Sequence, residues 1–483
     1  MRFLVLIGLL TSVAWHGAVA KDQSPQARQA PEGNERFIAY KKGKQLFINA
    51  TIIDGTGAPP RSNTDVFVND GVIENVTERT GPRNQMLMKD VTVIDMAGKT
   101  LLPGLVMMHE HLFYPMRGDN YASMPYSFPA LYLAGGETTA RTTGSMSPYT
   151  DLGVRAAIES GQAIGPKLDI TGPYLTGPGI PIYDMIELKG PQQARETVNF
   201  WADQGVTSFK VYMHITRENL KAAIGVAHAR GIKVTGHLCS VTYREAAELG
   251  IDNLEHGFGA MTDFVKGKKP DECPKGGGSA LADVDLASAK FKSLVKFLID
   301  HHVVLTSTLG VFESFAPGRP EASEAARNLL IPELREDYEK TWAQVQKGGP
   351  RYDREGVVFA KLMKAQKMFV DTGGTLMMGS DPTGYGGVLP GYSSKRELEL
   401  LVESGFSFPQ AVQIATLNAA RYLGRDKEIG TIEAGKHADL VVIDGDPMKD
   451  VKAVENMPLV FKDGVGYDTA AIINSFKGEV GLQ

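Results

Sequence analysis

Two histidines separated by a single residue, His109 and His111, follow the apolar run at residues 100–108. On a β-strand, residues i and i+2 point to the same face, so both imidazoles would project together from the end of a buried strand. Imidazole nitrogen is a ligand that zinc and related divalent ions prefer. The pair therefore indicates a metal site, although alone it is a weak signal because His-x-His is common by chance.

Further metal-competent side chains stand within or just after later apolar runs. Lys210 lies inside one run, and His237 and His256 each close a short one. Asp381 follows the last run by two residues. If these runs are parallel strands, their carboxyl ends meet on one side of the fold. Four imidazoles, a lysine and a carboxylate would then converge there.

The elements that would position these residues alternate from about residue 103. Apolar runs and helical stretches follow one another, which predicts parallel strands joined by crossover helices, with helices at residues 217–230 and 243–249. Eight runs are candidate strands: residues 104–108, 137–142, 167–171, 208–213, 233–236, 253–255, 303–308 and 375–379. Eight repeats favour a (β/α)8 TIM barrel, with a doubly wound open sheet as the alternative.

Short β-type runs flank this region on both sides. The candidate strands on the N-terminal flank are residues 46–53, 65–68, 71–76 and 91–95. On the other flank a helix is predicted at residues 408–423, residues 430–444 are again β-rich, and residues 459–464 indicate a hairpin arm. We expect both chain ends to build one small β-sandwich domain. The predicted organisation is a signal peptide at 1–20, an extended arm at 21–44, the sandwich at 45–102 and 425–483, and the barrel at 103–424.

The first twenty residues have the pattern of a secretory signal peptide. Arg2 precedes an apolar core at residues 3–13, and Ala18-Val19-Ala20 fits a small-x-small cleavage site; a buried first helix is the alternative. We therefore expect an exported protein, periplasmic or secreted, that does not insert into a membrane once the signal is removed. The net charge of -5 gives no electrostatic reason to expect a nucleic-acid partner.

Two cysteines, Cys239 and Cys273, are present in the whole chain. An exported location permits a disulfide. Cys273 lies in the loop at residues 258–283, which is long, rich in Lys, Pro and Gly, and placed on the expected catalytic side, where such loops form lids. We predict that a disulfide pins this lid, with two free thiols as the alternative. The Gly-rich segment at residues 383–391 is interpreted as a mobile substrate loop.

Together these motifs resemble the amidohydrolase superfamily of metal-dependent hydrolases, and most closely its imidazolonepropionase-like and prolidase-like branch. The resemblance covers nearly all of the chain after residue 45. It is carried by Pro103-Gly-Leu-x-x-x-His-x-His111, Gly-His237, Leu-Glu-His-Gly257, Gly379-Ser-Asp381 and Gly430-x-Ile-x-x-Gly-Lys-x-Ala-Asp-Leu440. The chain departs from the family at Met107 and Thr142, where relatives often carry Asp, so a relative's substrate does not transfer directly.

The resemblance implies two divalent metal ions. His109 and His111 would bind the more buried ion, and His237 and His256 the more exposed one. Zn²⁺ is the first expectation because its geometry accepts mixed nitrogen and oxygen ligands. Mn²⁺, Co²⁺, Fe²⁺ or Ni²⁺ could occupy the same ligands.

Lys210 matches the lysine that two-metal members carry as an N6-carboxylysine, a carbamate formed from CO2 that bridges both ions. An ammonium would repel the metals, whereas a carbamate is anionic and bidentate. The shared hydroxide is a strong nucleophile at neutral pH because metals lower the pKa of bound water. Asp381 matches the aspartate that ligates the buried ion and passes the proton to the leaving nitrogen. An ordinary solvated or salt-bridged lysine is the alternative for Lys210.

Four further side chains are candidate substrate contacts. Tyr212 shares the strand face of Lys210 and could donate a hydrogen bond to a carboxylate or oxyanion, or simply pack in the interior. Arg141 could bind a carboxylate with two hydrogen bonds, with a structural ion pair as the alternative. His214 and Tyr114 are the other two candidates.

These observations predict a metal-dependent amidohydrolase that cleaves the amide bond of a dipeptide or an N-acyl amino acid, as a prolidase or carboxypeptidase does. Three alternatives stay open. One is a hydrolase of cyclic amides, lactones or phosphotriesters with the same two ions, the second is a deaminase with one ion, and the third is a non-catalytic exported binding protein. The expected partner is a small molecule, and a homo-oligomer is compatible with the sequence.

Overall fold

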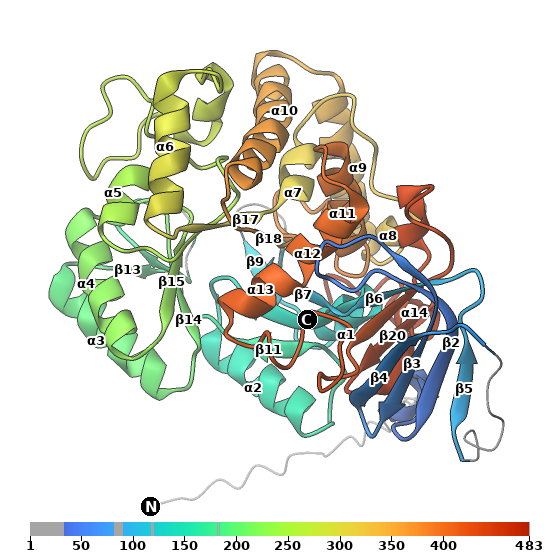
Figure 1. Ribbon diagram of the computed structural model, residues 1–483. Helices are drawn as coiled ribbons and strands as arrows, with labels where there is room; N and C mark the ends of the chain where they lie inside the picture. Colours follow the sequence, from blue (N-terminus) through green and yellow to red (C-terminus); the bar gives the residue numbers. More distant parts are fainter. Residues whose placement is uncertain (1–32, 82–89, 117–119, 181, 183, 483) are drawn as a thin grey trace, which may run out of the picture.

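The computed structural model describes residues 33–81, 90–116, 120–180, 182 and 184–482. It is a mixed α/β fold in which helices cover parallel strands on one side of the molecule and a separate, largely antiparallel sheet lies on the other (Figure 1). The predicted signal peptide and the first part of the arm, residues 21–32, lie outside the described residues. Across the described residues, none of the helices combines the length and apolarity needed to cross a bilayer.

Each of the eight strands predicted from the alternation has a counterpart in the structure. They are β7 (Leu105–Glu110), β10 (Glu137–Thr142), β11 (Lys167–Asp169), β14 (Ser208–Val211), β15 (Lys233–Gly236), β16 (Asn253–Leu254), β17 (Val304–Ser307) and β18 (Leu376–Met378). They pair in parallel in two sheets, in the orders β11-β10-β7 and β14-β15-β16-β17-β18, and the second sheet continues through β12 (Leu175–Thr176) to β13 (Ile186–Glu187).

The two parallel sheets meet edge to edge. An isolated parallel bridge joins Thr171, just after β11, to Ser208 at the start of β14. At the other edge, the backbone N–H groups of Ser380 and Asp381 donate to the carbonyl of His109, at 3.2 and 2.9 Å. Over the described residues the strands nevertheless remain two hydrogen-bonded sheets, so the predicted closed barrel is not shown. What is shown is a parallel α/β arrangement whose strand ends converge.

Helices pack on the outside of these strands (Figure 1). The α-helices are α1 (Ser127–Ala134), α2 (Pro148–Glu159), α3 (Pro191–Asp203), α4 (Arg217–Ala229), α5 (Tyr243–Glu248), α6 (Ala289–Asp300), α7 (Leu309–Ser314), α8 (Glu324–Arg327), α9 (Pro332–Gln346), α10 (Pro350–Asp371), α11 (Ser393–Glu403), α12 (Phe408–Ala415), α13 (Leu417–Tyr422) and α14 (Thr469–Ser475). Short 3-10 turns are η1 (Asn34–Phe37), η3 (Gly277–Asp283) and η4 (Val451–Glu455).

Local signals explain where several helices begin and end. Helix α5 begins with a capping box, in which Thr242 and Glu245 satisfy each other's backbone N–H groups. The single helix predicted at residues 408–423 is wrong, because Thr416 adopts φ -137 and ψ -83 and divides it into α12 and α13. Its hydroxyl donates to the carbonyl of Val412 at 2.6 Å, which holds the break in place.

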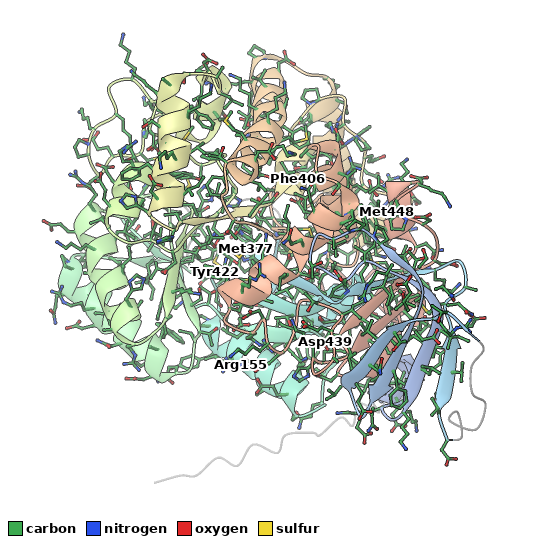
Figure 2. All side chains as sticks on the ribbon, viewed as in Figure 1. Arg155, Met377, Phe406, Tyr422, Asp439 and Met448 are labelled. Carbon is green, nitrogen blue, oxygen red and sulfur yellow. A yellow bond between two sulfur atoms is a disulfide. The ribbon has the colours of Figure 1, made fainter. Side chains whose placement is uncertain are left out.

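Helix α13 packs against the first and last of the parallel strands. Its Tyr422 joins a buried cluster with Met108 of β7 and Met377 of β18. Figure 2 shows Met377 and Tyr422 next to each other at this junction. The cluster fixes the two strands that carry His109, His111 and Asp381.

Both chain ends contribute to one nine-stranded sheet, as predicted. Its order is β1-β21-β20-β19-β6-β2-β3-β4, with β5 also paired to β2, so blue and red strands lie side by side in Figure 1. The strands are β1 (Ile38–Tyr40), β2 (Gln45–Ile52), β3 (Arg61–Asn69), β4 (Val72–Glu78), β5 (Thr92–Asp95), β6 (Thr100–Pro103), β19 (Leu440–Ile443), β20 (Leu459–Lys462) and β21 (Val465–Asp468). The end of the predicted arm is therefore strand β1.

The two-sheet sandwich predicted for this part is not confirmed, because its strands join in a single sheet over the described residues. Phe47, Val66, Leu440, Val442 and Phe461 belong to its own apolar cluster. Strand β6 pairs antiparallel with β19 and leads directly into β7. The sheet therefore fixes the strand that carries His109. The exact domain boundaries stay a prediction.

Candidate metal centre

His109 and His111 lie at the carboxyl end of β7, and Asp381 lies just beyond β18, which is beside β7. All three side chains are buried. Asp381 Oδ1 lies 3.7 Å from His109 Nε2 and 3.2 Å from His111 Nε2. Ligand atoms of the three residues all lie within 4.8 Å of one another, a spacing at which they could share one metal ion.

The backbone around these groups has two unusual features: a close contact between β18 and β7, and two non-glycine residues with positive φ. A Cβ on Gly379 would lie 2.6 Å from the backbone nitrogen of His109, so only glycine lets β18 come this close to β7. Asp381 and His256 both have positive φ, at 52° and 64°. Such conformations are rare outside glycine and cluster at functional sites, where the surrounding structure enforces them.

Lys210, His237 and His256 come to the same place from β14 and the ends of β15 and β16. Lys210 Nζ lies 3.2 Å from His109 Nε2. His256 Nδ1 lies 3.6 Å from Asp381 Oδ2, and the rings of His237 and His256 have centroids 4.5 Å apart. All six residues predicted as metal ligands are therefore together in the structure. Their roles as ligands stay a prediction.

The imidazoles are held in their neutral form. Burial lowers the pKa of His111 to about 4 and of His237 to about 3, and it also lowers the pKa of His109 and His256. Burial alone would raise the pKa of Asp381, but the imidazoles around it, His109 first, hold that pKa well below its usual value. Neutral imidazole and ionised carboxylate are the protonation states that bind metal ions.

Lys210 is a buried amine without a direct ion pair among the described residues. Its side chain is buried, and Nζ forms no ion pair within 4.0 Å with any carboxylate in the described part of the chain. Nζ instead lies 5.1 Å from the ring centroid of Tyr174. Burial lowers the pKa of Lys210 to about 8, which increases the share of neutral amine at neutral pH.

A carboxylate behind the site orients His109. His109 Nδ1 lies 2.7 Å from Glu255 Oε2, so Nδ1 donates its hydrogen and Nε2 presents a lone pair toward Lys210 and Asp381. Glu255 also accepts from Arg141 Nη2 at 2.8 Å. The interaction with His109, which donates a hydrogen bond, and the positive charge of Arg141 overcome the effect of burial and lower the pKa of Glu255 to about 2.

The residues present fit a metal. His256 Nε2 and His111 Nδ1 are buried and have no hydrogen-bond partner among the described residues. Buried neutral imidazoles grouped around an ionised carboxylate are the donor set that divalent transition ions prefer. The geometry therefore supports at least one ion at His109, His111 and Asp381.

The site opens into a cavity of about 300 Å³. His111, Lys210, His237, His256 and Asp381 line its floor. Its walls are mostly apolar or aromatic and include Phe113, Tyr121, Met146, Tyr174, Tyr212, Phe312 and Phe315. Gly278 and Ser279 of η3 and Arg351 and Glu355 of α10 also belong to the lining. The cavity is large enough for a small amide and is predominantly apolar.

Of the four predicted substrate contacts, Tyr212 lines the cavity, with its ring centroid 5.0 Å from that of His237. Arg141 does not, because it is buried and donates to the carbonyl of Met108 and to Glu255. The structural ion pair left open by the sequence is therefore the correct interpretation of Arg141.

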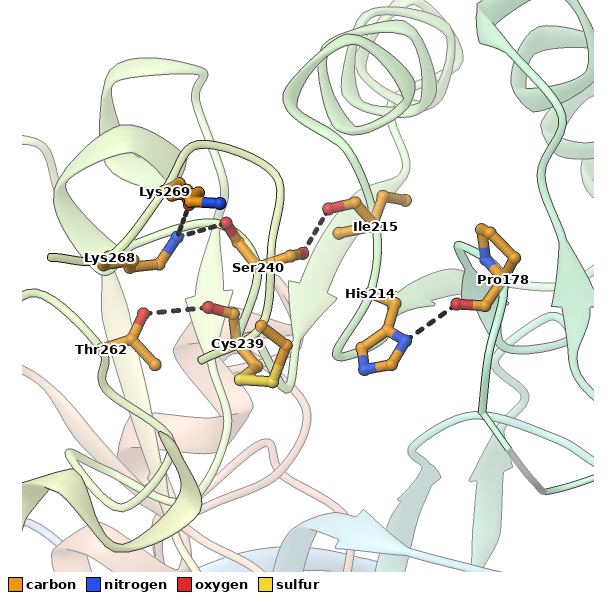
Figure 3. Close-up of a disulfide and its surroundings, with 9 residues drawn as sticks. Pro178, His214, Ile215, Cys239, Ser240, Thr262, Lys268 and Lys269 are labelled. Atoms are coloured by element: carbon orange, nitrogen blue, oxygen red, sulfur yellow. Dashed lines mark hydrogen bonds between the residues drawn. A yellow bond between two sulfur atoms is a disulfide. The ribbon is translucent and has the colours of Figure 1, made fainter. Parts of the chain in front are cut away.

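Tyr114 and His214 also lie outside the cavity lining. The hydroxyl of Tyr114 is buried and donates to the carbonyl of Gly386, so it fixes the loop after Asp381 instead of contacting a substrate. His214 Nδ1 lies 2.9 Å from the carbonyl oxygen of Pro178, which ties together two loops beyond the strand ends (Figure 3). Spacing along the chain placed both on the correct side of the fold but could not give the direction of either side chain.

The predicted disulfide between Cys239 and Cys273 is present (Figure 3). It joins the long loop after β16 to the segment that follows His237. The same junction is held by Thr262 Oγ1, which donates to the carbonyl of Cys239 at 3.0 Å, and by Lys268 Nζ, which donates to the carbonyl of Ser240 at 2.5 Å. Because η3 in this loop lines the cavity, the disulfide fixes one wall of the site.

Sequence reasoning missed Glu255, Tyr174 and Arg351. Glu255 lies in the Leu-Glu-His-Gly motif, directly before the candidate ligand His256. Because neighbouring side chains in extended backbone point to opposite faces, this position could have indicated a supporting role behind the site. Tyr174 follows β11 without any pattern of its own. Arg351 stands on α10, in a helical stretch that carried no chemical signal.

The comparisons with known proteins agree with this geometry. The model of the amidohydrolase family matches residues 100–466, which include every candidate ligand. The chain belongs to the amidohydrolase family. It is accordingly a metal-dependent hydrolase that acts on carbon–nitrogen bonds.

Solved structures share the fold. An Xaa-Pro dipeptidase with bound methionine is 21% identical, with a TM-score of 0.65 over 88% of this chain and 100% of that one. A prolidase in complex with N-methylphosphonate-L-proline is 18% identical, with a TM-score of 0.63 over 88% and 99%. An ochratoxinase from A. niger is 18% identical, with a TM-score of 0.62 over 88% and 95%. At these identities the likeness shows the fold.

A curated relative matches over a short stretch. The 5-methylthioadenosine/S-adenosylhomocysteine deaminase of Moorella thermoacetica is 66% identical over 35 residues, which are 7% of this chain and 8% of that protein. The match covers too small a part of either protein to carry an activity across.

Proposed function

We propose that the protein is a two-metal amidohydrolase that cleaves the amide bond of a dipeptide or an N-acyl amino acid. The observation that carries this proposal is the position of Lys210, buried, without an ionic partner among the described residues and 3.2 Å from a candidate metal ligand. The solved structures named as a prolidase and an Xaa-Pro dipeptidase support the choice of an amide between amino acids.

The proposed metal arrangement uses all six clustered residues. His109, His111 and Asp381 would hold one ion, and His237 and His256 the other. Zn²⁺ is the proposed metal, and Mn²⁺, Co²⁺, Fe²⁺ or Ni²⁺ would suit the same donors. When bound, the two ions lower the pKa of water so that a hydroxide nucleophile is available at neutral pH, and they polarise the amide carbonyl.

Lys210 would carry a CO2-derived carbamate that bridges both sites. A buried ammonium without a direct ion pair is costly because burial removes its hydration. Burial favours the neutral amine, which is the form that reacts with CO2. The carbamate would replace the positive ammonium, which repels metal ions, with two oxygens that share one negative charge.

Asp381 would move the proton. Its Oδ1 accepts a hydrogen bond from the hydroxyl of Thr383 at 2.8 Å, which fixes the carboxylate. From this position it would take the proton of the attacking water and give it to the leaving nitrogen. The hydroxyl of Tyr212 would donate to the oxyanion that forms on the former carbonyl oxygen.

The experiment is a screen of dipeptides and N-acyl amino acids with enzyme purified without chelator. We expect hydrolysis that chelation abolishes and a divalent ion restores. Full activity after complete removal of metal would overturn the proposal. Ammonia release from an aminated heterocycle, without amide hydrolysis, would favour the one-metal deaminase, to which the short match with a curated deaminase draws attention.

We further propose that the parallel strands form a (β/α)8 barrel and that the terminal sheet belongs to a small β-sandwich. The contacts at the two edges where the parallel sheets meet support the barrel. An experimental structure with continuous ladders across both edges is the expected result, and an open gap at either edge would contradict it.

We also propose that the protein is exported to the periplasm or secreted. The signal-like pattern at residues 1–20 and the disulfide between Cys239 and Cys273 support this, because disulfides persist in oxidising compartments. Mature protein that begins at Lys21 is the expected result of N-terminal sequencing. A mature chain that retains Met1 and both free thiols would contradict it.

A further inference from the structure

Arg351 is an arginine in the cavity that the proposed mechanism does not use. It is the second residue of α10 and lines the same cavity as Lys210, His256 and Asp381. Its side chain is exposed, and its guanidinium carbon lies 5.5 Å from the ring centroid of Tyr352. No carboxylate of the described chain lies within 4.0 Å of it, so its positive charge faces the cavity unpaired.

Its expected partner on the helix is engaged elsewhere. Glu355 is four residues further along α10, the spacing at which opposite charges usually pair. Glu355 instead accepts a hydrogen bond from the hydroxyl of Ser279. Other arginines nearby are paired, since Arg354 bonds to Asp283 and Arg319 to Glu313. Arg351 is therefore open for a ligand.

The start of α10 is a fixed platform. Arg354 Nη2 donates to the carbonyl of Ser279 at 3.0 Å, and Lys361 Nζ donates to the carbonyls of Ala282 and Val284 at 2.6 and 2.8 Å. These bonds hold α10 against η3, whose Ser279 lines the cavity. The position of Arg351 relative to the metal-side floor is therefore set by the fold.

We propose that Arg351 binds the free carboxylate of the amino-acid half of the substrate and makes the enzyme select amides that carry one. This inference rests on the proposed function. A guanidinium can donate two parallel hydrogen bonds to a carboxylate, and Arg351 lines the same cavity as the candidate metal ligands. Arg351 thus takes the role that the sequence suggested for Arg141.

The test compares two substrates that differ in one group. The best N-acyl amino acid of the screen and its C-terminal carboxamide are assayed with wild type, Arg351→Met and Arg351→Lys. We expect Arg351→Met to raise KM for the acid about 10- to 100-fold, with a smaller change in kcat, and to leave KM for the carboxamide unchanged. Arg351→Lys should recover part of the lost affinity for the acid, because lysine keeps the positive charge but lacks the planar pair of N–H donors.

Lys364→Met is the matched control on the same helix. It removes one positive charge from an exposed side chain outside the cavity lining, so KM for the acid should stay unchanged. An equal effect of Arg351→Met on acid and carboxamide, or no effect on either, would overturn the inference. Failure of the proposed function would look different, because wild type itself would then hydrolyse none of the amides.

Discussion

At the scale of single residues, the centre depends on one hydrogen bond that sets the orientation of His109. Glu255 holds Nδ1 at 2.7 Å, which directs Nε2 toward Lys210 and Asp381. The same carboxylate neutralises Arg141, which is buried beneath the site. One acidic side chain thus fixes a candidate ligand and balances a buried charge, and both effects should be lost together.

Glu255→Gln keeps the size of the side chain but removes its charge. We expect metal affinity to fall about 10- to 100-fold, because partners behind a ligand usually contribute this much. We also expect a loss of about 3 to 5 kcal/mol in the free energy of unfolding, since Arg141 remains buried without its partner. Chelator competition and urea denaturation measure the two effects. The exposed Glu74→Gln is the control and should change neither.

The lowered pKa of His111 predicts a pH dependence for metal-free protein. With a pKa of about 4 when folded and about 6.5 when unfolded, the unfolded chain binds the proton first as pH falls. Stability from the neutral imidazole is complete above about pH 6.5 and falls by about 1.4 kcal/mol per pH unit down to about pH 4. Urea denaturation at pH 7 and pH 5 measures it.

Burial raises the pKa values of the acids Glu110 and Glu137, so they contribute a slope of unfolding free energy against pH of the opposite sign. The slope that belongs to His111 must therefore be obtained as a difference between two proteins. Wild type minus His111→Gln isolates the histidine. Equal slopes in the two proteins would show that His111 does not titrate as described.

At the scale of elements, the site is made by the ends of strands that meet. The residues that end or follow β7, β15, β16 and β18, and Lys210 on β14, were predictable because each belongs to a motif placed on a recognisable parallel strand. The directions of Arg141, Tyr114 and His214 were not, since they depend on the partners that packing brings to each side chain. The place of Arg351 in the cavity lining could not be predicted from the sequence, because it depends on the packing of α10 against η3.

Gly379→Ala tests the junction of the first and last strands. The new methyl group would meet the backbone of His109 at 2.6 Å, so β18 must move away from β7. We expect a lower melting temperature and the loss of at least one metal equivalent, as measured by calorimetry and elemental analysis. Gly153→Ala in α2, where a Cβ meets nothing within 4 Å, should leave both unchanged or raise stability slightly. Full metal content in Gly379→Ala would contradict the account.

At the scale of the whole molecule, the two chain ends join in one sheet that leads into the site. Strand β6 pairs with β19 and continues into β7, so contacts far apart in the sequence position the first two candidate ligands. The sequence indicated that both ends cooperate, because their β-type texture is alike. It could not show whether they form one sheet or two, since strand order depends on pairing that periodicity does not encode.

The central claim is a two-metal site bridged through Lys210, and metal content per chain tests it most directly. Protein purified without chelator is compared with Lys210→Ala and with the exposed Lys221→Ala as control. We expect two equivalents in wild type and in the control, with a sharp fall to one or fewer in Lys210→Ala. One equivalent in wild type, unchanged by Lys210→Ala, would contradict the bridge and leave a one-metal enzyme.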